Sequence, residues 1–309
     1  MAFSFDPKSN LPLVLGGNVF GWSADRASSF AVLDGFVEAG GTQIDTADAY
    51  ARWLPGSSGG ESETIIGEWL ATSRKRDQVF LASKVGALAP WDNLTPGTIA
   101  EAVDNSLRRL QTDYLDLYWA HRDDEDTPQE ETLQAFDALV NAGKVRYLGA
   151  SNFSADRLQS ALELCGERGL APYVAAQPLY NLLERSGWRD GAGKVALAHN
   201  LATWPYSGLA SGFLSGKYRR GAIVESVRSN TVAKYFDDRG YAVIDAAERI
   251  AAEHRVSIAA VALRWLAQQP GVLAPIASAR TPQQLAELVT IADFTLSADQ
   301  LAVLEAAAS

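Results

Sequence analysis

Residues 79–120 read VFLASKVGALAPWDNLTPGTIAEAVDNSLRRLQTDYLDLYWA and contain one predicted strand–helix–strand unit. Residues 79–84 and 115–120 are short and mostly apolar, as expected of strands buried on both faces of a parallel sheet. Thr95 and Pro96, between these runs, supply a helix N-cap followed by a proline at the first helical position. The helix itself is indicated by an apolar stripe with helical spacing, formed by Ile99, Val103, Leu107 and Leu110.

The same alternation runs along the whole chain of 309 residues. Eight apolar runs are predicted strands, at residues 12–16, 42–45, 79–84, 115–120, 145–150, 173–177, 201–206 and 272–277. This pattern indicates a closed (β/α)8 barrel or an open, doubly wound sheet. Because no G-x-G-x-x-G follows the first run, the open dinucleotide-binding sheet is the weaker alternative. We predict the α/β class and a (β/α)8 TIM barrel, in a single domain over residues 1–309.

Two further features concern loops and helix starts. Residues 211–240 form a long irregular stretch after the seventh predicted strand, which is typical of a functional loop or lid. Thr127 and Thr281 each precede a proline, with Glu130 and Gln284 three residues after them. Both places therefore predict a helix that begins with a capping box.

The composition indicates a globular protein with an acidic surface. The formal net charge is −10, so the surface repels phosphate backbones and a nucleic-acid partner is not expected. The single cysteine, Cys165, lies in an apolar helical stripe, permits no internal disulfide and fits a reducing compartment. Residues 1–10 lack a signal-peptide pattern, and no apolar stretch approaches the ~20 residues of a membrane span. We therefore expect a cytoplasmic protein without a membrane partner.

Polar residues end three successive predicted strands. Asp45 ends the second run, with Tyr50 shortly after it; Lys84 ends the third run, and His121 follows the fourth. In a parallel barrel, catalytic groups gather at the C-terminal ends of the strands. Taken singly, each residue could be a solvated or loop-packing group, but together they predict a catalytic site.

These four side chains suit the protonation of an oxygen atom. A tyrosine is a poor acid near neutral pH because its ordinary pKa is about 10. We expect the Lys84 ammonium to stabilise the Tyr50 phenolate and lower the pKa of Tyr50, with Asp45 holding the lysine in place. His121 can orient a carbonyl oxygen through a hydrogen bond. Because the set offers no strong nucleophile, it predicts that a cofactor supplies a hydride.

At these residues the sequence resembles the aldo-keto reductase superfamily, and the resemblance runs through essentially the whole chain. DTADAY at 45–50, with GESE at 60–63, resembles the signature around the catalytic aspartate and tyrosine of that family. SK at 83–84 and WAH at 119–121 resemble the motifs that hold its lysine and histidine. The resemblance implies a (β/α)8 barrel, catalytic roles for the four residues, and NADPH bound across the rim without a Rossmann domain.

The resemblance also implies a set of cofactor contacts. GASNF at 149–153, AQPLYN at 176–181 and YSGL at 206–209 resemble segments that bind the nicotinamide. GKY at 216–218 resembles a pyrophosphate motif, and PIASAR at 275–280 resembles the segment for the adenosine ribose phosphate. The implied cofactor-binding residues are Asp45, Ser151, Asn152, Gln177, Tyr206, Ser207, Leu209, Lys217, Ser278, Arg280 and Gln284.

Two positions depart from the family pattern. Gly208 stands where the family usually has a proline, and Leu288 where an asparagine often contacts the adenine. Arg280 favours NADPH over NADH, because a guanidinium group can bind a 2′-phosphate through two parallel hydrogen bonds.

Aromatic residues follow the first three predicted strands and are candidate substrate contacts: Phe20, Trp22, Trp53 and Trp91. They would line a pocket for a ring-bearing or apolar carbonyl compound or stack on a sugar, or they would only pack the loops together.

Several functions stay open at this point. The first is reduction of an aldehyde or ketone with NADPH, with Tyr50 as general acid and base. The second is oxidation of a sugar or secondary alcohol with NAD(P)+, because the same groups act in both directions. The third is a non-catalytic NADPH-binding regulatory subunit. We expect no metal site, because a metal-dependent hydrolase needs several ligands at the rim and His121 is the only histidine expected there. His199 and His254 fall near the ends of predicted helices. The sequence leaves the physiological substrate and the oligomeric state open.

Overall fold

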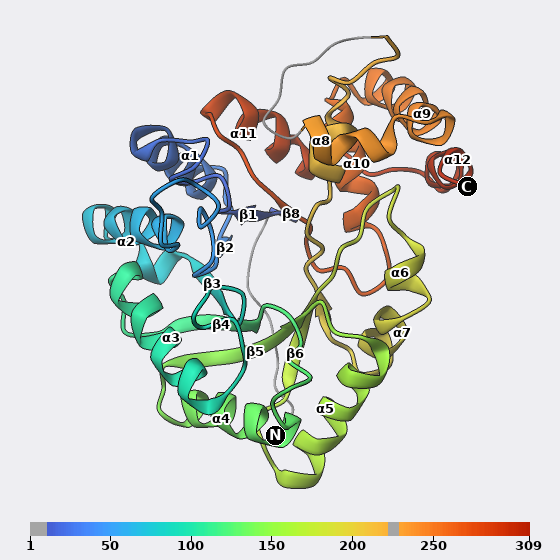
Figure 1. Ribbon diagram of the computed structural model, residues 1–309. Coiled ribbons are helices and arrows are strands. Elements are labelled where there is room, and N and C mark those ends of the chain that lie inside the picture. The colour runs from blue at the N-terminus through green and yellow to red at the C-terminus, as the bar shows by residue number, and fades with distance from the viewer. Residues whose placement is uncertain (1–10, 222–228) are drawn as a thin grey trace.

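Parallel strands curl around a common axis in the computed structural model, which describes residues 11–221 and 229–309 (Figure 1). Within these residues the strands are β1 (Val14–Gly16), β2 (Gln43–Asp45), β3 (Phe80–Val85), β4 (Leu115–Ala120), β5 (Val145–Ser151), β6 (Tyr173–Gln177), β7 (Ala202–Thr203) and β8 (Ile276–Ala277). Their order in the sheet is β7-β6-β5-β4-β3-β2-β1-β8, and all of the pairs are parallel.

The two ends of this sheet meet and close the barrel. Thr203 in β7 forms a parallel bridge with Val272, and the backbone N–H of Leu273 donates to the Thr203 carbonyl at 2.9 Å. The backbone N–H of Ile276 donates to the Pro205 carbonyl at 2.8 Å. The predicted (β/α)8 barrel is therefore confirmed.

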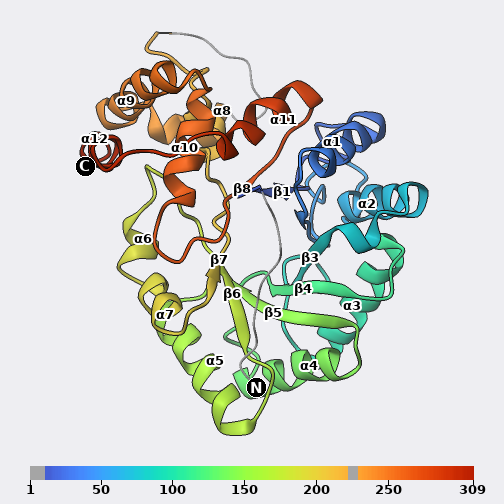
Figure 2. The same ribbon diagram turned by 180° about the vertical axis from the view of Figure 1, so that it is seen from behind.

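Helices surround the strands on the outside, as the view from behind also shows (Figure 2). They are α1 (Arg26–Glu38), α2 (Glu61–Ser73), α3 (Pro96–Leu110), α4 (Gln129–Asn141), α5 (Ala155–Arg168), α6 (Ser186–Arg189), α7 (Ala192–Ala198), α8 (Ser229–Val232), α9 (Asp238–His254), α10 (Ile258–Ala267), α11 (Pro282–Val289) and α12 (Ala298–Ala307). None of the helices in the described residues is long and apolar enough to cross a bilayer.

The apolar core has two layers, which follows from strands that alternate their side chains between faces. A small cluster fills the barrel interior: Val14, Ala82, Leu117, Trp119, Ala175, Trp204, Ala274 and Ile276. Within it, Trp119 and Trp204 meet edge to face with ring centroids 5.7 Å apart. A larger cluster packs the helices against the strands and includes Cys165, which is 2% exposed, as its place in an apolar stripe predicts.

Some predicted boundaries are wrong. The seventh and eighth runs, 201–206 and 272–277, shorten to two-residue strands, because each contains a proline that cannot donate to the sheet. The predicted cap at Thr127 does not form: its hydroxyl donates to Asp124 at 2.6 Å, and α4 begins at Gln129 without a side-chain cap.

The stretch 211–240, which was predicted to be irregular, contains several short helical segments. A 3-10 turn, η2, spans Ala210–Ser215, a second one, η3, spans Ala233–Tyr235, and α9 begins at Asp238. The middle of the stretch, 222–228, lies outside the described residues.

Candidate active site

Lys84 is the centre of the candidate site and is completely buried in β3. Its Nζ donates to Asp45 Oδ2 at 2.5 Å, to the Tyr50 hydroxyl at 2.8 Å and to the backbone carbonyl of Thr46 at 2.7 Å. Three of the four predicted catalytic residues are thus in direct contact. Their charged and polar atoms satisfy one another, which a buried ammonium requires.

The strands explain how this contact forms. Asp45 ends β2 opposite Ala82 of β3, so the loop that carries Tyr50 leaves the sheet beside Lys84. From across the barrel, Gln177 at the end of β6 donates through Nε2 to Asp45 Oδ1 at 3.0 Å. Ser151 in turn donates through its hydroxyl to the Gln177 carbonyl at 2.8 Å. The rim is therefore a connected network of hydrogen bonds.

His121 lies beside Tyr50. Its backbone N–H donates to the Val85 carbonyl at 2.8 Å, and its ring stands edge-on to the Tyr50 ring, with centroids 6.2 Å apart. Nδ1 of His121 is buried and has no hydrogen-bond partner within the part of the chain that the structure describes. All four predicted catalytic residues therefore meet at one end of the barrel.

Lys84 lowers the pKa of Tyr50 as expected, but the net direction of the shift is opposite to the expected one. Burial raises the pKa of Tyr50 above its ordinary value, and the opposing effect of Lys84 is smaller. The phenol is therefore protonated at neutral pH. Burial also lowers the pKa of Lys84, but Asp45 and Tyr50 raise it more, so the pKa of Lys84 ends above its usual range and the ammonium persists.

His121 is held as a neutral imidazole. Burial lowers its pKa well below the ordinary value of 6.5, and the cationic side chains of Lys84, Arg52 and Arg122 lower it further. A neutral imidazole still has one N–H donor for a ligand oxygen.

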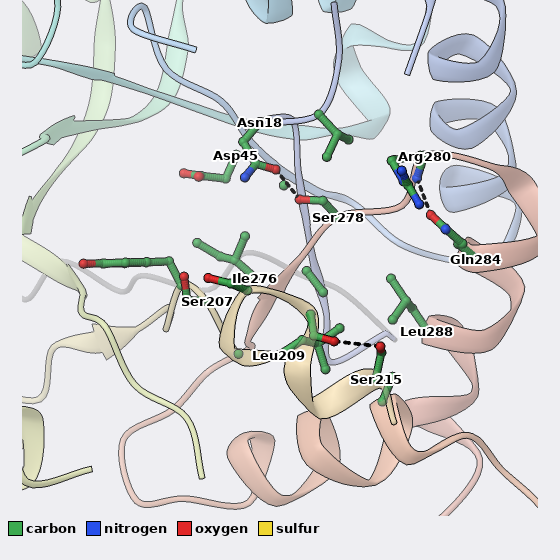
Figure 3. Close-up of a pocket in the computed structure, with 18 of the residues that line it drawn as sticks. Asn18, Asp45, Ser207, Leu209, Ser215, Ile276, Ser278, Arg280, Gln284 and Leu288 are labelled. Carbon is green, nitrogen blue, oxygen red and sulfur yellow. Dashed lines mark hydrogen bonds between the residues drawn. The ribbon is translucent and has the colours of Figure 1, made fainter. Parts of the chain in front are cut away.

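A cavity of about 640 Å³ adjoins these residues and continues along the rim (Figure 3). Asp45, Tyr50 and His121 line it, whereas Lys84 lies behind them. In Figure 3, Arg280 and Gln284 lie together at α11, and Ser278 lies between them and Asp45. The cavity is also lined by each of the eleven predicted cofactor-binding residues: Asp45, Ser151, Asn152, Gln177, Tyr206, Ser207, Leu209, Lys217, Ser278, Arg280 and Gln284.

Residues 12–309 match the family model described as "Aldo/keto reductase family". The chain belongs to the aldo-keto reductase family. Members are oxidoreductases that act on carbonyls or alcohols, typically with nicotinamide cofactors.

Three relatives of this chain have names that indicate different functions. Aldo-keto reductase YhdN of Bacillus subtilis is 33% identical over 296 residues, which cover 92% of this chain and 84% of the relative. An aryl-alcohol dehydrogenase of Pestalotiopsis microspora is 28% identical over a region that covers 95% of this chain and 78% of the relative. A protein of Oryza sativa named "probable voltage-gated potassium channel subunit beta" is 30% identical over 87% of this chain and 83% of its own.

Polar contacts position several cavity side chains of this aldo-keto reductase. Asn152, whose backbone has a positive φ of 59°, donates through Nδ2 to the His121 carbonyl at 2.9 Å. The Tyr206 hydroxyl donates to Asn152 Oδ1 at 2.7 Å. Thr281 caps α11 as predicted, since its side chain accepts the Gln284 backbone N–H. The Gln284 side chain, however, accepts the backbone N–H of Arg280 at 2.9 Å and not that of Thr281, so the capping box is incomplete.

Sequence reasoning missed some residues that line the cavity. Asn18 follows β1, and its Oδ1 accepts a hydrogen bond from the Ser278 hydroxyl at 2.6 Å. Other missed residues are Gly16, Val19, Ser23, Ser211, Gly212, Ser215, Ala259 and Glu287. Gly16 could have been found from the sequence, because it is a glycine at the end of a predicted strand. In the structure a Cβ at this position would lie 2.7 Å from Ser278 Oγ.

The four predicted aromatic contacts do not line this cavity. Phe20 is fully buried, and Trp91 packs against Ala49, Ala87 and Leu88. Trp22 and Trp53 meet edge to face with ring centroids 5.3 Å apart, and Trp53 is 48% exposed. Trp53 is therefore the most exposed of the four aromatic residues.

No group of three or more His, Cys, Asp or Glu side chains within residues 11–221 and 229–309 is arranged to hold a metal ion.

Proposed function

We propose that this protein is an NADPH-dependent reductase of aldehydes or ketones, with Tyr50 as the general acid. The observation that carries the proposal is the 2.8 Å contact between Lys84 Nζ and the Tyr50 hydroxyl at the inner end of the cavity. A protonated phenol that borders a cavity, with an ammonium behind it, suits proton transfer to an oxygen that gains negative charge.

The residues that line the cavity fit a nicotinamide dinucleotide. Gln177, bonded to Asp45, and Asn152, bonded to the Tyr206 hydroxyl, provide amide groups suited to the carboxamide, and Tyr206 provides a ring on which to stack. Lys217 and Arg280 provide cations for phosphate groups. When bound, this cofactor supplies the hydride for the carbonyl carbon.

Arg280 supports NADPH over NADH. Its guanidinium has no ion-pair partner in the part of the chain that the structure describes, and it precedes the N-terminus of α11. A guanidinium binds a phosphate through two hydrogen bonds, and a helix N-terminus also favours negative charge.

The chain's own residues then complete the reduction. Tyr50 donates its phenolic proton to the carbonyl oxygen, so hydride and proton together convert the carbonyl to an alcohol. Lys84 stabilises the phenolate that remains, and Asp45 keeps the ammonium in place. His121 orients the carbonyl oxygen as a neutral hydrogen-bond donor.

The reverse reaction, oxidation of an alcohol with NADP+, is the second candidate, because the same groups can accept the proton. The similarity to an aryl-alcohol dehydrogenase supports it. A non-catalytic role, suggested by the channel-subunit relative, is a lower alternative because the four predicted catalytic residues come together in this chain.

A spectrophotometric screen tests the proposal. Aldehydes, ketones, secondary alcohols and sugars are assayed with NADPH, NADH and their oxidised forms, in both directions. We expect carbonyl-dependent oxidation of NADPH that is faster than that of NADH. Tight NADPH binding without turnover of any compound would favour the non-catalytic role instead.

A further inference from the structure

The last residue of β3, Val85, and the two residues after it accept hydrogen bonds through their backbone carbonyls from donors near His121. The Val85 carbonyl accepts the His121 backbone N–H at 2.8 Å, and the Gly86 carbonyl accepts Arg122 Nε at 2.9 Å. The Ala87 carbonyl accepts a hydrogen bond from Nη1 of Arg52. Two guanidinium groups are therefore anchored on neighbouring peptide units, next to the residue that borders Tyr50.

Of these two cations, Arg122 alone has an ion-pair partner in the part of the chain that the structure describes. Arg122 also donates to the Asp92 backbone carbonyl at 3.1 Å, and its guanidinium is 3.8 Å from the Asp92 carboxylate, with both side chains 49% exposed. Arg52 has no ion-pair partner within residues 11–221 and 229–309. Together with Lys84, these side chains are the charged groups that lower the pKa of His121. Three cationic side chains therefore lie around His121 on a chain whose formal net charge is −10.

Arg52 also stands next to an apolar wall. Trp53 follows it in the chain, is 48% exposed and meets Trp22 edge to face. Both residues lie in the loop between β2 and α2 that also carries Tyr50, and Ala51, between Tyr50 and Arg52, has a positive φ of 71°. The same loop therefore carries the proposed acid, Tyr50, the guanidinium of Arg52 and an exposed aromatic ring, Trp53, on which a flat, apolar group could pack.

We propose that the substrate is a carbonyl compound with a carboxylate group, and that Arg52 binds this carboxylate with help from Arg122. The inference rests on the proposed function, since it assumes that Tyr50 and His121 receive the carbonyl oxygen. Guanidinium and carboxylate groups match in two parallel hydrogen bonds. Arg52 thus determines which carbonyl compounds the site accepts.

A matched pair of aldehydes tests the proposal. 4-Carboxybenzaldehyde and its methyl ester have the same ring and the same reacting group, but only the acid carries a charge. We expect the wild-type protein to have the higher kcat/KM for the acid. The ratio of kcat/KM values, acid over ester, should fall about 10- to 100-fold in Arg52→Ala, because a hydrogen-bonded charge contact is lost. Arg52→Lys, which keeps the charge, should restore part of the ratio.

Arg168→Ala is the matched control, because it removes an arginine that lies in α5 and pairs with Glu130 at the surface. It should leave the ratio unchanged, which excludes an effect of overall charge. An Arg52→Ala ratio equal to that of the wild type would overturn the proposal, and so would a wild-type preference for the ester.

Binding distinguishes this inference from the proposed function. Calorimetric titration of 4-carboxybenzaldehyde into the protein with NADPH should show weaker binding to Arg52→Ala than to the wild type. If the wild type reduces neither aldehyde but binds the acid through Arg52, the proposed reductase function fails while the carboxylate site stands. If it reduces both equally well and Arg52→Ala binds the acid as the wild type does, only the carboxylate site fails.

Discussion

Burial raises the pKa of Tyr50 more than the Lys84 ammonium lowers it, so the phenol keeps its proton to a higher pH than an ordinary tyrosine does. In the reductive direction the phenol therefore starts in the form that donates. In the oxidative direction it must first lose that proton, so alcohol oxidation should require a higher pH than carbonyl reduction.

Removing the ammonium tests this balance. In Lys84→Met the phenolate loses the charge that stabilises it, so kcat for carbonyl reduction should fall by about 10²- to 10⁴-fold. The pH at which alcohol oxidation becomes measurable should move upward as well. Steady-state rates in both directions across pH measure both effects. An unchanged pH profile for oxidation would contradict the role of Lys84.

His121 makes stability depend on pH in a defined direction. Its folded pKa lies well below 6.5, so below pH 6.5 the unfolded chain takes up a proton that the folded protein excludes. Stability is therefore lost as the pH falls from 6.5 towards the folded pKa.

Urea unfolding of wild type and His121→Gln measures this loss. Between about pH 7 and about pH 5.5, the wild type should lose roughly 1 kcal/mol more of its unfolding free energy than the variant loses. Equal losses would show that His121 is not held neutral.

At the residue scale, the sequence predicted which side chains meet but not the balance of their energies. Asp45, Lys84 and His121 could be found because each stands at the end of an apolar strand, where a barrel presents its rim. The direction of the Tyr50 pKa could not, because it depends on how deeply the loop after β2 buries the phenol.

Helix α2 is tied to its neighbours by a buried carboxylate. Glu63, fully buried near the start of α2, pairs with Arg109 of α3 at 2.6 Å and accepts a hydrogen bond from the Ser83 hydroxyl of β3 at 2.5 Å. Gly60, which precedes α2 with a φ of 86°, leaves room for this pair, since a Cβ there would lie 2.5 Å from Arg109 Cδ. The loop with Tyr50 runs between β2 and this anchored helix.

Removing one partner of the pair should destabilise the fold. Arg109→Ala leaves the Glu63 carboxylate buried without its cation, which typically costs about 3–5 kcal/mol of unfolding free energy. The double variant Glu63→Gln with Arg109→Ala removes the uncompensated charge and should recover part of this loss. Denaturant unfolding measures both, and a double variant less stable than Arg109→Ala would contradict the account.

Elements were predictable where apolar runs carry no proline. Residues 115–120 and 173–177 are strands with the predicted bounds. Pro205 and Pro275 have no backbone N–H to donate, so β7 and β8 are shorter than the apolar pattern alone predicted. The failed cap at Thr127 has a similar cause, since Asp124 competes for the threonine hydroxyl.

The whole barrel brings together residues that are far apart in the chain. Asp45 and Gln177 are bonded across 132 positions, and Asn18 and Ser278 across 260. No local pattern reveals Asn18 as a partner, because its place depends on the closure of the sheet between β1 and β8. Resemblance to the family, by contrast, predicted eleven residues that all line one cavity.

The proposed cofactor should stabilise the whole molecule. A ligand at 100 times its Kd adds about 2.7 kcal/mol to the unfolding free energy, so NADPH should raise Tm, and more than NADH does. In Arg280→Ala the two cofactors should give similar shifts, because the guanidinium that would bind the 2′-phosphate is gone. Thermal unfolding with each cofactor measures this, and an unchanged difference would assign the preference to other residues.

The most direct test of the central claim is the rate of NADPH oxidation by Tyr50→Phe, saturated with cofactor and with an aldehyde that the wild type reduces. Phenylalanine keeps the ring and loses only the hydroxyl that Lys84 contacts. We predict a kcat about 10²- to 10⁴-fold below that of the wild type, with NADPH affinity within a few-fold. A variant that binds NADPH and reduces the aldehyde at the wild-type rate would contradict the account.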